Sequence, residues 1–164
     1  MKEFDATFDS INDQPKKPVP GKYPSHVSGF EAVSLKSGGK VFNIDFTLAN
    51  ECKNMENAFM AGKQYRSAGV FLTANLPSGE RWKNKKYNEF FTNMGVKFPV
   101  DEKGIVKLQE VEEEDIIGLP AIADIQVYKY TTKDGEERTS MRVMNVFPWN
   151  DGARKEQKES DVPF

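Results

Sequence analysis

Aromatic side chains stand beside lysines and arginines at several separated places in this 164-residue chain. Lys63, Tyr65 and Arg66 form one such group, and a second surrounds Tyr128. An exposed ring can stack on a nucleobase while a neighbouring cation meets a phosphate. These groups predict contacts to a single-stranded nucleic acid, and the candidate residues are Lys40, Lys63, Tyr65, Arg66, Trp82, Lys83, Tyr128, Tyr130, Arg138 and Arg142.

The densest basic segment, residues 81–87, has two interpretations. Its four cations and two aromatic residues fit a nucleic-acid contact. Helical spacing instead favours Trp82 and Tyr87 packing inward, with the lysines in solvent. Tyr65 also has two interpretations. Its ring either stacks on a base or is half buried at a solvated strand end.

Charge is unevenly distributed along the chain. The formal net charge is −2, which argues against simple electrostatic binding of nucleic acid. Residues 53–107 nevertheless contain ten lysines and arginines against five acids, whereas residues 108–124 contain six acids and no base. A local basic surface is therefore compatible with the overall acidity.

Composition also limits the classes of function. Hydrophobic residues make up 38% of the chain, and no apolar run approaches the ~20 residues of a membrane span, so we expect no membrane partner. The single histidine, His26, and the single cysteine, Cys52, argue against a catalytic triad, a disulfide or a metal cluster. We expect no cofactor, no metal and no enzymatic activity. A nuclease using Asp45 and the acids of residues 110–115 is an alternative that no ligand spacing supports.

Strand signals begin after a proline-rich lead-in. Residues 23–35 read as a first strand, and the glycines at 38 and 39 predict a hairpin turn. Residues 41–48 alternate, which puts Phe42 and Phe46 on a core face and Asp45 on a solvent face, where its charge would repel phosphate.

The second half continues the pattern. Residues 62–74 predict a third strand that bends at Gly69, and residues 80–94 predict a helix. Residues 121–130 and 136–147 predict two further strands joined by the Asp134–Gly135 turn. Alternation places Ala123, Ile125 and Val127 in the core and turns Gln126 and Tyr128 outward. On the last strand it puts Arg142 on the other face from Met141 and Val143.

This order predicts a mainly β fold, a five-stranded OB-type Greek-key barrel with a helix between strands 3 and 4. A generic antiparallel barrel or sandwich is the alternative. The expected organisation is an N-terminal arm over residues 1–20, an OB-fold nucleic-acid-binding domain over 21–149 and a flexible tail over 150–164.

The last six residues have the features of a segment that a partner protein grips. Acidic residues precede an apolar end, and proline limits the entropy lost on capture. The residues that we expect to bind a partner are Asp161, Val162, Pro163 and Phe164.

This ending is similar to the tail of bacterial and phage single-stranded DNA-binding proteins, which closes in Ile-Pro-Phe or a variant. Residues 20–23, the hairpin into residues 41–48, Gly62 and residues 118–120 resemble a family of phage-encoded single-stranded DNA-binding proteins with an OB fold. The resemblance implies coating of single strands during phage replication and recombination, recruitment of replication or recombination proteins by the tail, and a cytoplasmic location in the infected bacterial host cell. The tail departs from the family because Arg154, Lys155 and Lys158 offset its acids.

Two functions therefore remain open. The first is a non-catalytic single-stranded DNA-binding protein. The second is an OB-like module that binds a component of a replication or recombination complex and has little affinity for nucleic acid; the net acidity favours it. The sequence also leaves open whether the chain forms a homo-oligomer.

Overall fold

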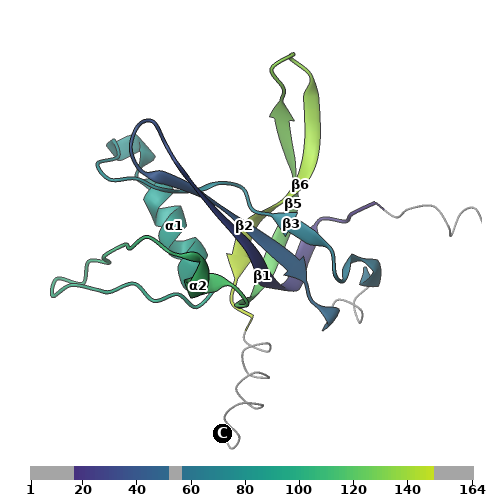
Figure 1. Cartoon of the computed structure of the whole chain (residues 1–164), viewed down its shortest axis with the longest axis horizontal. Coiled ribbons are helices and arrows are strands. Elements are labelled where there is room, and N and C mark those ends of the chain that lie inside the picture. Colours follow the sequence, from purple (N-terminus) through teal and green to yellow (C-terminus); the bar gives the residue numbers. More distant parts are fainter. Residues whose placement is uncertain (1–16, 52–56, 150–164) are drawn as a thin grey trace, which may run out of the picture.

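A computed structural model describes residues 17–51 and 57–149 (Figure 1). The predicted tail with Asp161 to Phe164, most of the predicted N-terminal arm and Cys52 lie outside these described residues. Within them, the protein is mainly β, with one long helix and several short ones. No helix in the described part has the length and apolar character needed to cross a membrane.

The first two strands form a long antiparallel hairpin. β1 spans Gly21–Ser34 and β2 spans Lys40–Leu48, with Val27 opposite Phe46 and Ala32 opposite Phe42. Gly38 and Gly39 both have φ near +89°, which L side chains rarely adopt, so the predicted turn is confirmed. The predicted alternation of β2 is also confirmed, because Phe42, Ile44 and Phe46 are fully buried.

The third strand predicted over residues 62–74 is confirmed only in part, because it is interrupted at residues 67–69. The segment after the short helix η2 (Ala58–Met60) forms two strands, β3 (Gln64–Arg66) and β4 (Val70–Leu72), which both pair with β2. Between them the chain turns toward another strand: Ala68 N–H donates to the Val143 carbonyl at 3.0 Å. A change of hydrogen-bond partner thus interrupts the strand.

The remaining strands almost close the sheet into a barrel. β5 spans Pro120–Thr131 and β6 spans Glu137–Phe147. The strand order is β3-β2-β1-β5-β6, and a parallel bridge between Ser67 and Val143 brings the two ends of this order together. The result is a nearly closed antiparallel barrel of five to six strands (Figure 1).

Helix α1 packs against the barrel and completes the core. The helix η3 (Ser78–Glu80) leads into α1 (Trp82–Asn93), and Gly95 follows with φ +104°. Tyr87 and Phe91 pack edge-on against Phe42 of β2, with ring centroids 5.4 and 6.1 Å away. Aromatic edge-to-face packing therefore fixes the helix against the strands.

Polar side chains of α1 also bind the backbone at the ends of the sheet. Asn84 pairs with both backbone groups of Thr73, accepting from N–H at 3.0 Å and donating to C=O at 2.7 Å. Lys86 and Asn93 donate to the carbonyls of Met144 and Val146 at 2.7 and 2.8 Å. These bonds satisfy strand groups that would otherwise need a neighbouring strand.

The prediction that Val127 lies in the core is wrong, because its side chain is 49% exposed. Ala123 and Ile125, on the same face, are fully buried as predicted. β5 pairs with β1 only as far as Ile125 and continues with β6 alone. Beyond that point the β5–β6 hairpin projects from the barrel (Figure 1), so no other described strand pairs with it there and Val127 is left exposed.

Between α1 and β5 the chain makes a long excursion over residues 94–119. It contains one short helix, α2 (Glu113–Ile116), which overlaps the acidic residues 110–115. Tyr87 holds this excursion against the helix: its hydroxyl donates to the Gln109 carbonyl and accepts from the Val111 N–H, both at 2.8 Å. Burial of this hydroxyl raises the pKa of Tyr87 to about 12.

Candidate nucleic-acid interface

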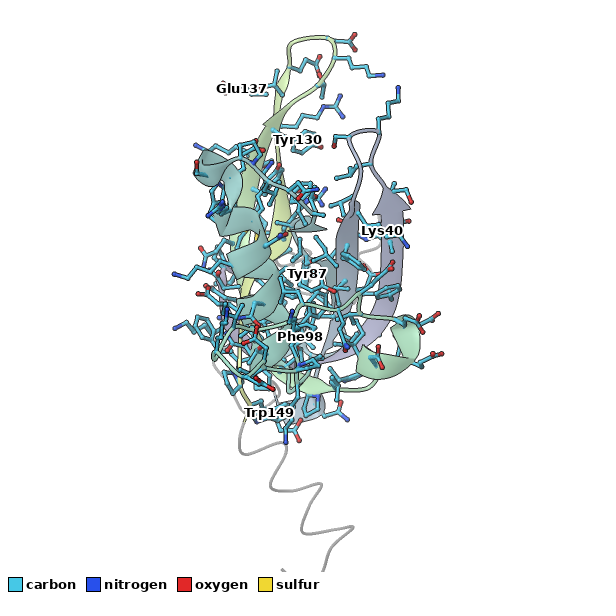
Figure 2. All side chains as sticks on the ribbon, turned by 90° about the vertical axis from the view of Figure 1, so that its left-hand side faces the viewer. Lys40, Tyr87, Phe98, Tyr130, Glu137 and Trp149 are labelled. Carbon is cyan, nitrogen blue, oxygen red and sulfur yellow. The ribbon has the colours of Figure 1, made fainter. Side chains whose placement is uncertain are left out.

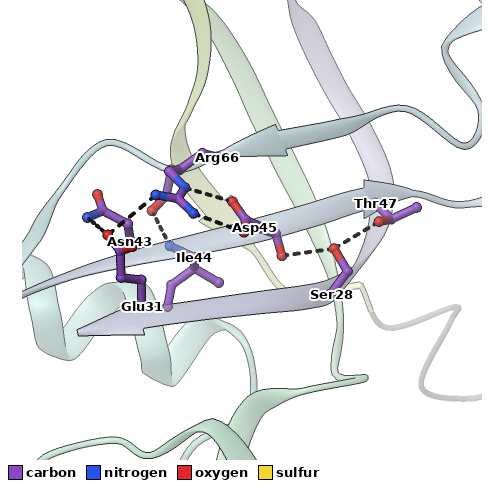
Figure 3. Close-up of polar contacts among 8 residues, drawn as sticks. Ser28, Glu31, Asn43, Ile44, Asp45, Thr47 and Arg66 are labelled. Atoms are coloured by element: carbon purple, nitrogen blue, oxygen red, sulfur yellow. Dashed lines mark hydrogen bonds and ion pairs between the residues drawn. The ribbon is translucent and has the colours of Figure 1, made fainter.

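Arg66 occupies the centre of one outer surface, here called the β1–β2–β3 face. Its Nε donates to Oδ1 of Asp45 at 2.9 Å, and its Nη1 lies 3.4 Å from Oε1 of Glu31 (Figure 3). The hydrogen bond to Asp45 is the largest of the effects that raise the pKa of Arg66. The guanidinium that the sequence assigned to phosphate therefore already has two carboxylate partners.

The surroundings of Arg66 support this arrangement. Asp45 lies across Gly29 of β1, where an added Cβ would stand 2.4 Å from its Oδ2, so a side chain there would force the carboxylate away. Asn43 also faces Glu31, with Nδ2 3.5 Å from Oε1 (Figure 3). The expectation that Asp45 simply repels phosphate is thus incomplete, because its charge is balanced by Arg66.

Tyr65 lies on the other side of β3 from Arg66. It pairs with Phe46, packs against the core and donates its hydroxyl to Sδ of Met60 at 3.9 Å. Burial is the main cause that raises the pKa of Tyr65. The structure therefore does not bring the Tyr65 ring and the Arg66 guanidinium to one surface.

The two lysines predicted near this face have contacts elsewhere. Lys63 places Nζ 6.0 Å from the ring centroid of Phe59. Lys40 forms an ion pair with Glu110 of the acidic excursion. Lys40 lies two residues before the buried Phe42, and Lys63 lies two residues before Tyr65, so neither shares the outer side of the strands with Arg66.

A different arrangement occurs on the outer surface of the β5–β6 hairpin, here called the hairpin face. Tyr128 and Tyr130, 37% and 38% exposed, stack with centroids 6.2 Å apart and planes inclined by 25°. The Arg142 guanidinium lies 5.2 Å from the Tyr128 ring centroid. Among residues 17–51 and 57–149, no carboxylate forms an ion pair with Arg142.

The strand register explains why these residues come together. Tyr130 is opposite Arg138, Tyr128 is opposite Ser140, and Gln126 is opposite Arg142. Directly opposite residues project from the same side of a sheet, as do residues two apart. Arg138 pairs with Glu136 at 3.0 Å, but both side chains are largely exposed, and such pairs exchange readily with solvent.

The start of α1 carries the other predicted aromatic residue. Trp82 is 59% exposed, so the interpretation in which it packs inward is wrong, whereas Tyr87 is buried. Trp82 is the first residue of the helix, one turn before the helix reaches the core. Lys83 is held nearby, with Nζ 5.1 Å from the Phe71 centroid and 3.5 Å from Glu80.

The sequence interpretation missed one pair that extends the hairpin face toward the barrel. Lys22 of β1 places Nζ 4.5 Å from the ring centroid of Phe147, which is 36% exposed. Lys22 is opposite Asp124 and Phe147 is opposite Ile122, so both share the outer side with Gln126 and Tyr128. The alternation of residues at the ends of β1 and β6 is the sequence pattern that could have predicted that Lys22 and Phe147 share a side.

Nothing in the described part suggests a metal centre, since no three His, Cys, Asp or Glu side chains gather there in a way that could hold an ion. Comparison with known proteins adds no assignment: no family model matches the chain, and no curated protein matches it significantly.

Proposed function

We propose that this protein binds single-stranded nucleic acid, DNA in the first place, on the hairpin face. The observation that carries the proposal is the exposed Tyr128–Tyr130 stack beside Arg142, whose charge has no carboxylate partner in the described residues. Bases would stack on the rings, and Arg142 and Arg138 would meet phosphates. Ring stacking accepts every base, so we expect little sequence preference.

The arrangement of the strands supports an OB-type Greek-key barrel. If β3 and β4 count as one bent strand, the neighbours run first, second, third, fifth, fourth and back to first. On this interpretation α1 is the helix between strands three and four, and the β5–β6 hairpin corresponds to the loop between strands four and five. In OB folds that loop and the face of strands two and three bind oligonucleotides.

The cellular role that we propose follows from the resemblance to phage single-stranded DNA-binding proteins. The protein would coat and protect exposed strands during replication or recombination. The tail residues Asp161 to Phe164 would recruit partner proteins by inserting the apolar end into a pocket with a basic rim.

A protein-interaction module with little nucleic-acid affinity is the second candidate. The observation that favours it concerns the β1–β2–β3 face, where Arg66 already forms ion pairs with Glu31 and Asp45. Together with the net charge of −2, this leaves part of the expected OB surface unsuited to phosphate.

The test is a titration of the full chain with oligo-dT of about 30 nucleotides, followed by intrinsic tryptophan and tyrosine fluorescence at low and moderate salt. We expect quenching that weakens as salt rises, because phosphate contacts release counterions. A duplex of equal length is the matched ligand control, and we expect it to compete poorly.

The Tyr128→Ala variant locates the binding surface, and Tyr65→Ala is its matched control. Tyr128→Ala should weaken oligo-dT binding, whereas Tyr65→Ala, which removes a half-buried ring, should leave the affinity unchanged. No quenching at either salt, together with an unshifted band on a native gel, would reject nucleic-acid binding and favour the interaction module.

A further inference from the structure

The lower half of the molecule carries a surface with different chemistry, here called the α1–loop groove. Two adjoining hollows share Val96, Lys97 and Phe98, which follow α1. In Figure 2 the hairpin with Tyr130 and Glu137 is at the top, and Phe98 is well below it. The groove is therefore separate from the hairpin face.

One half of the groove is apolar. Val100 and Val106 line it together with Val96 and Phe98, beside Asn88 and Thr92 of α1. Val100 is 60% exposed and Val106 is 39% exposed, although both are hydrophobic. Nearby in the chain, Ile105 is also exposed. Exposed apolar side chains gathered in one hollow are typical of a surface that another molecule covers.

The apolar wall has a fixed shape. Val100 and Val106 form an antiparallel bridge, and between them the Asp101 carboxylate accepts from the N–H groups of Lys103 and Ile105 at 2.8 and 2.9 Å. These bonds define a tight turn. A surface ordered in advance loses less entropy when it binds a partner.

The other half of the groove is acidic. Glu110 and Asp115 line it beside Lys97, and Glu110 already pairs with Lys40. Glu113 and Glu114 precede Asp115 in the first turn of α2. Residues 96–117 contain seven acids and three bases. A hydrogen bond with Glu114 and neighbouring negative charges raise the pKa of Glu112, which is the response of a carboxylate crowded by like charges.

We propose that the α1–loop groove binds a basic amphipathic segment of a partner protein, with apolar side chains on Val100 and Val106 and lysines or arginines on the carboxylates of α2. Charge complementarity selects this occupant, because a cation relieves the crowding of the acids and an acidic segment would be repelled. A helix with an apolar stripe and a cationic side has this pattern. The acids also keep nucleic acid away from the groove, so both surfaces can be occupied together.

The test measures binding of a fluorescein-labelled 14-residue helical peptide of leucine and lysine to the full chain by fluorescence anisotropy. We expect saturable binding with one peptide per chain that weakens as salt rises. The same peptide with glutamate in place of each lysine should bind at least tenfold more weakly.

Two double variants separate the contributions. Val100→Ser with Val106→Ser should weaken peptide binding about tenfold or more, since the leucines of the peptide lose both apolar side chains that they would cover. Glu113→Gln with Glu114→Gln should weaken it about threefold and reduce its dependence on salt. All four side chains are exposed, so we expect the melting temperature to change little.

Matched controls make the same changes elsewhere. Val33→Ser alters a valine of similar exposure on β1, and Glu136→Gln with Glu137→Gln removes two charges from the β5–β6 hairpin. These variants should bind the peptide like the unchanged protein. Equal loss in control and groove variants would overturn the proposal, as would equal binding of the glutamate peptide.

Two other occupants are distinguishable. A synthetic peptide of residues 150–164 that bound the groove more tightly than the lysine peptide would show that the chain's own tail covers it. Sedimentation that revealed a dimer disrupted by the Val100→Ser and Val106→Ser changes would assign the groove to a second copy. Either result would overturn the proposal without bearing on the hairpin face.

Discussion

The β1–β2–β3 face and the hairpin face belong to the same sheet and both carry arginines. Arg66 on the first is held by Asp45 and Glu31 at 2.9 and 3.4 Å. Arg142 on the second contacts the Tyr128 ring and forms no ion pair within the described residues. A phosphate must displace two carboxylates from the first arginine, whereas it can approach the second directly.

The difference shows that the number of cations along a chain does not tell which of them are free to meet an added anion. A guanidinium with two carboxylate neighbours has little net attraction for another anion. The aromatic residues differ in the same way: the Tyr65 ring packs on the core, but Tyr128 and Tyr130 present exposed, stacked rings. Binding should therefore depend on the hairpin face and be insensitive to Arg66.

The largest expected effect comes from removing both exposed rings. The Tyr128→Ala and Tyr130→Ala double variant should weaken oligo-dT binding about 30-fold or more, because each stacked base contributes ~1–3 kcal/mol. The double change to phenylalanine keeps both rings and should bind within about threefold of the unchanged protein. Fluorescence titration measures both. Equal losses in the two variants would show that the hydroxyls, not the rings, make the contact.

A change in the core separates loss of folding from loss of binding. Tyr87→Phe leaves the Val111 N–H and the Gln109 carbonyl without their shared partner and should reduce the free energy of unfolding by about 1–3 kcal/mol. Urea denaturation measures this loss. At low urea the variant should still bind oligo-dT normally, since Tyr87 is on neither face.

The same variant gives a pH prediction. Folding raises the pKa of Tyr87 from 10.0 to about 12, so above pH 10 the unfolded chain releases this proton first. The stabilising contribution of the neutral hydroxyl is complete below pH 10 and is lost as pH rises toward 12. The difference in unfolding free energy between the unchanged protein and Tyr87→Phe should therefore shrink over that interval. A difference that stayed constant would contradict the buried hydrogen-bonded hydroxyl.

Arg142 should contribute less to oligo-dT affinity than the two tyrosine rings do, but its contribution should be measurable. Arg142→Ala should weaken oligo-dT binding about tenfold, since hydrogen bonds to charged groups contribute ~1.5–3 kcal/mol and solvent partly compensates. Arg142→Lys retains the charge and should recover part of the affinity. An unchanged affinity in Arg142→Ala, measured at low salt, would remove this residue from the interface.

The smallest effects concern the β1–β2–β3 face. Glu31→Gln frees part of the Arg66 guanidinium and should strengthen oligo-dT binding about two- to threefold. Lys40 provides the comparison, because its carboxylate partner, Glu110, is on the acidic excursion; Glu110→Gln should leave the affinity unchanged. Competition titration resolves differences of this size. Weaker binding in Glu31→Gln would mean that Glu31 positions Arg66 for binding.

Local patterns predicted much of the fold. The alternation of Phe42, Ile44 and Phe46 gave the core face of β2 correctly, and Gly38, Gly39 and Gly135 occupy turns with positive φ. The helix was predicted within two residues of its observed ends. These features depend on neighbours within a few positions in the chain.

The predictions that failed concern features that depend on residues far away in the sequence. The break between β3 and β4 arises because Ala68 bonds to Val143, a residue far along the chain. Val127 continues a buried alternation but lies past the last residue of β5 that pairs with β1. The pairing of Arg66 with Asp45 and Glu31 requires the register of three strands, which no local pattern contains.

The most direct test of the comparison is the salt dependence of oligo-dT binding in Arg142→Ala and Arg66→Ala. Each phosphate contact contributes about 0.7 to the slope of the logarithm of the binding constant against the logarithm of salt concentration. We predict that Arg142→Ala lowers the slope by about that amount and that Arg66→Ala leaves it unchanged. A lower slope in Arg66→Ala with no change in Arg142→Ala would contradict the account and transfer the interface to the β1–β2–β3 face.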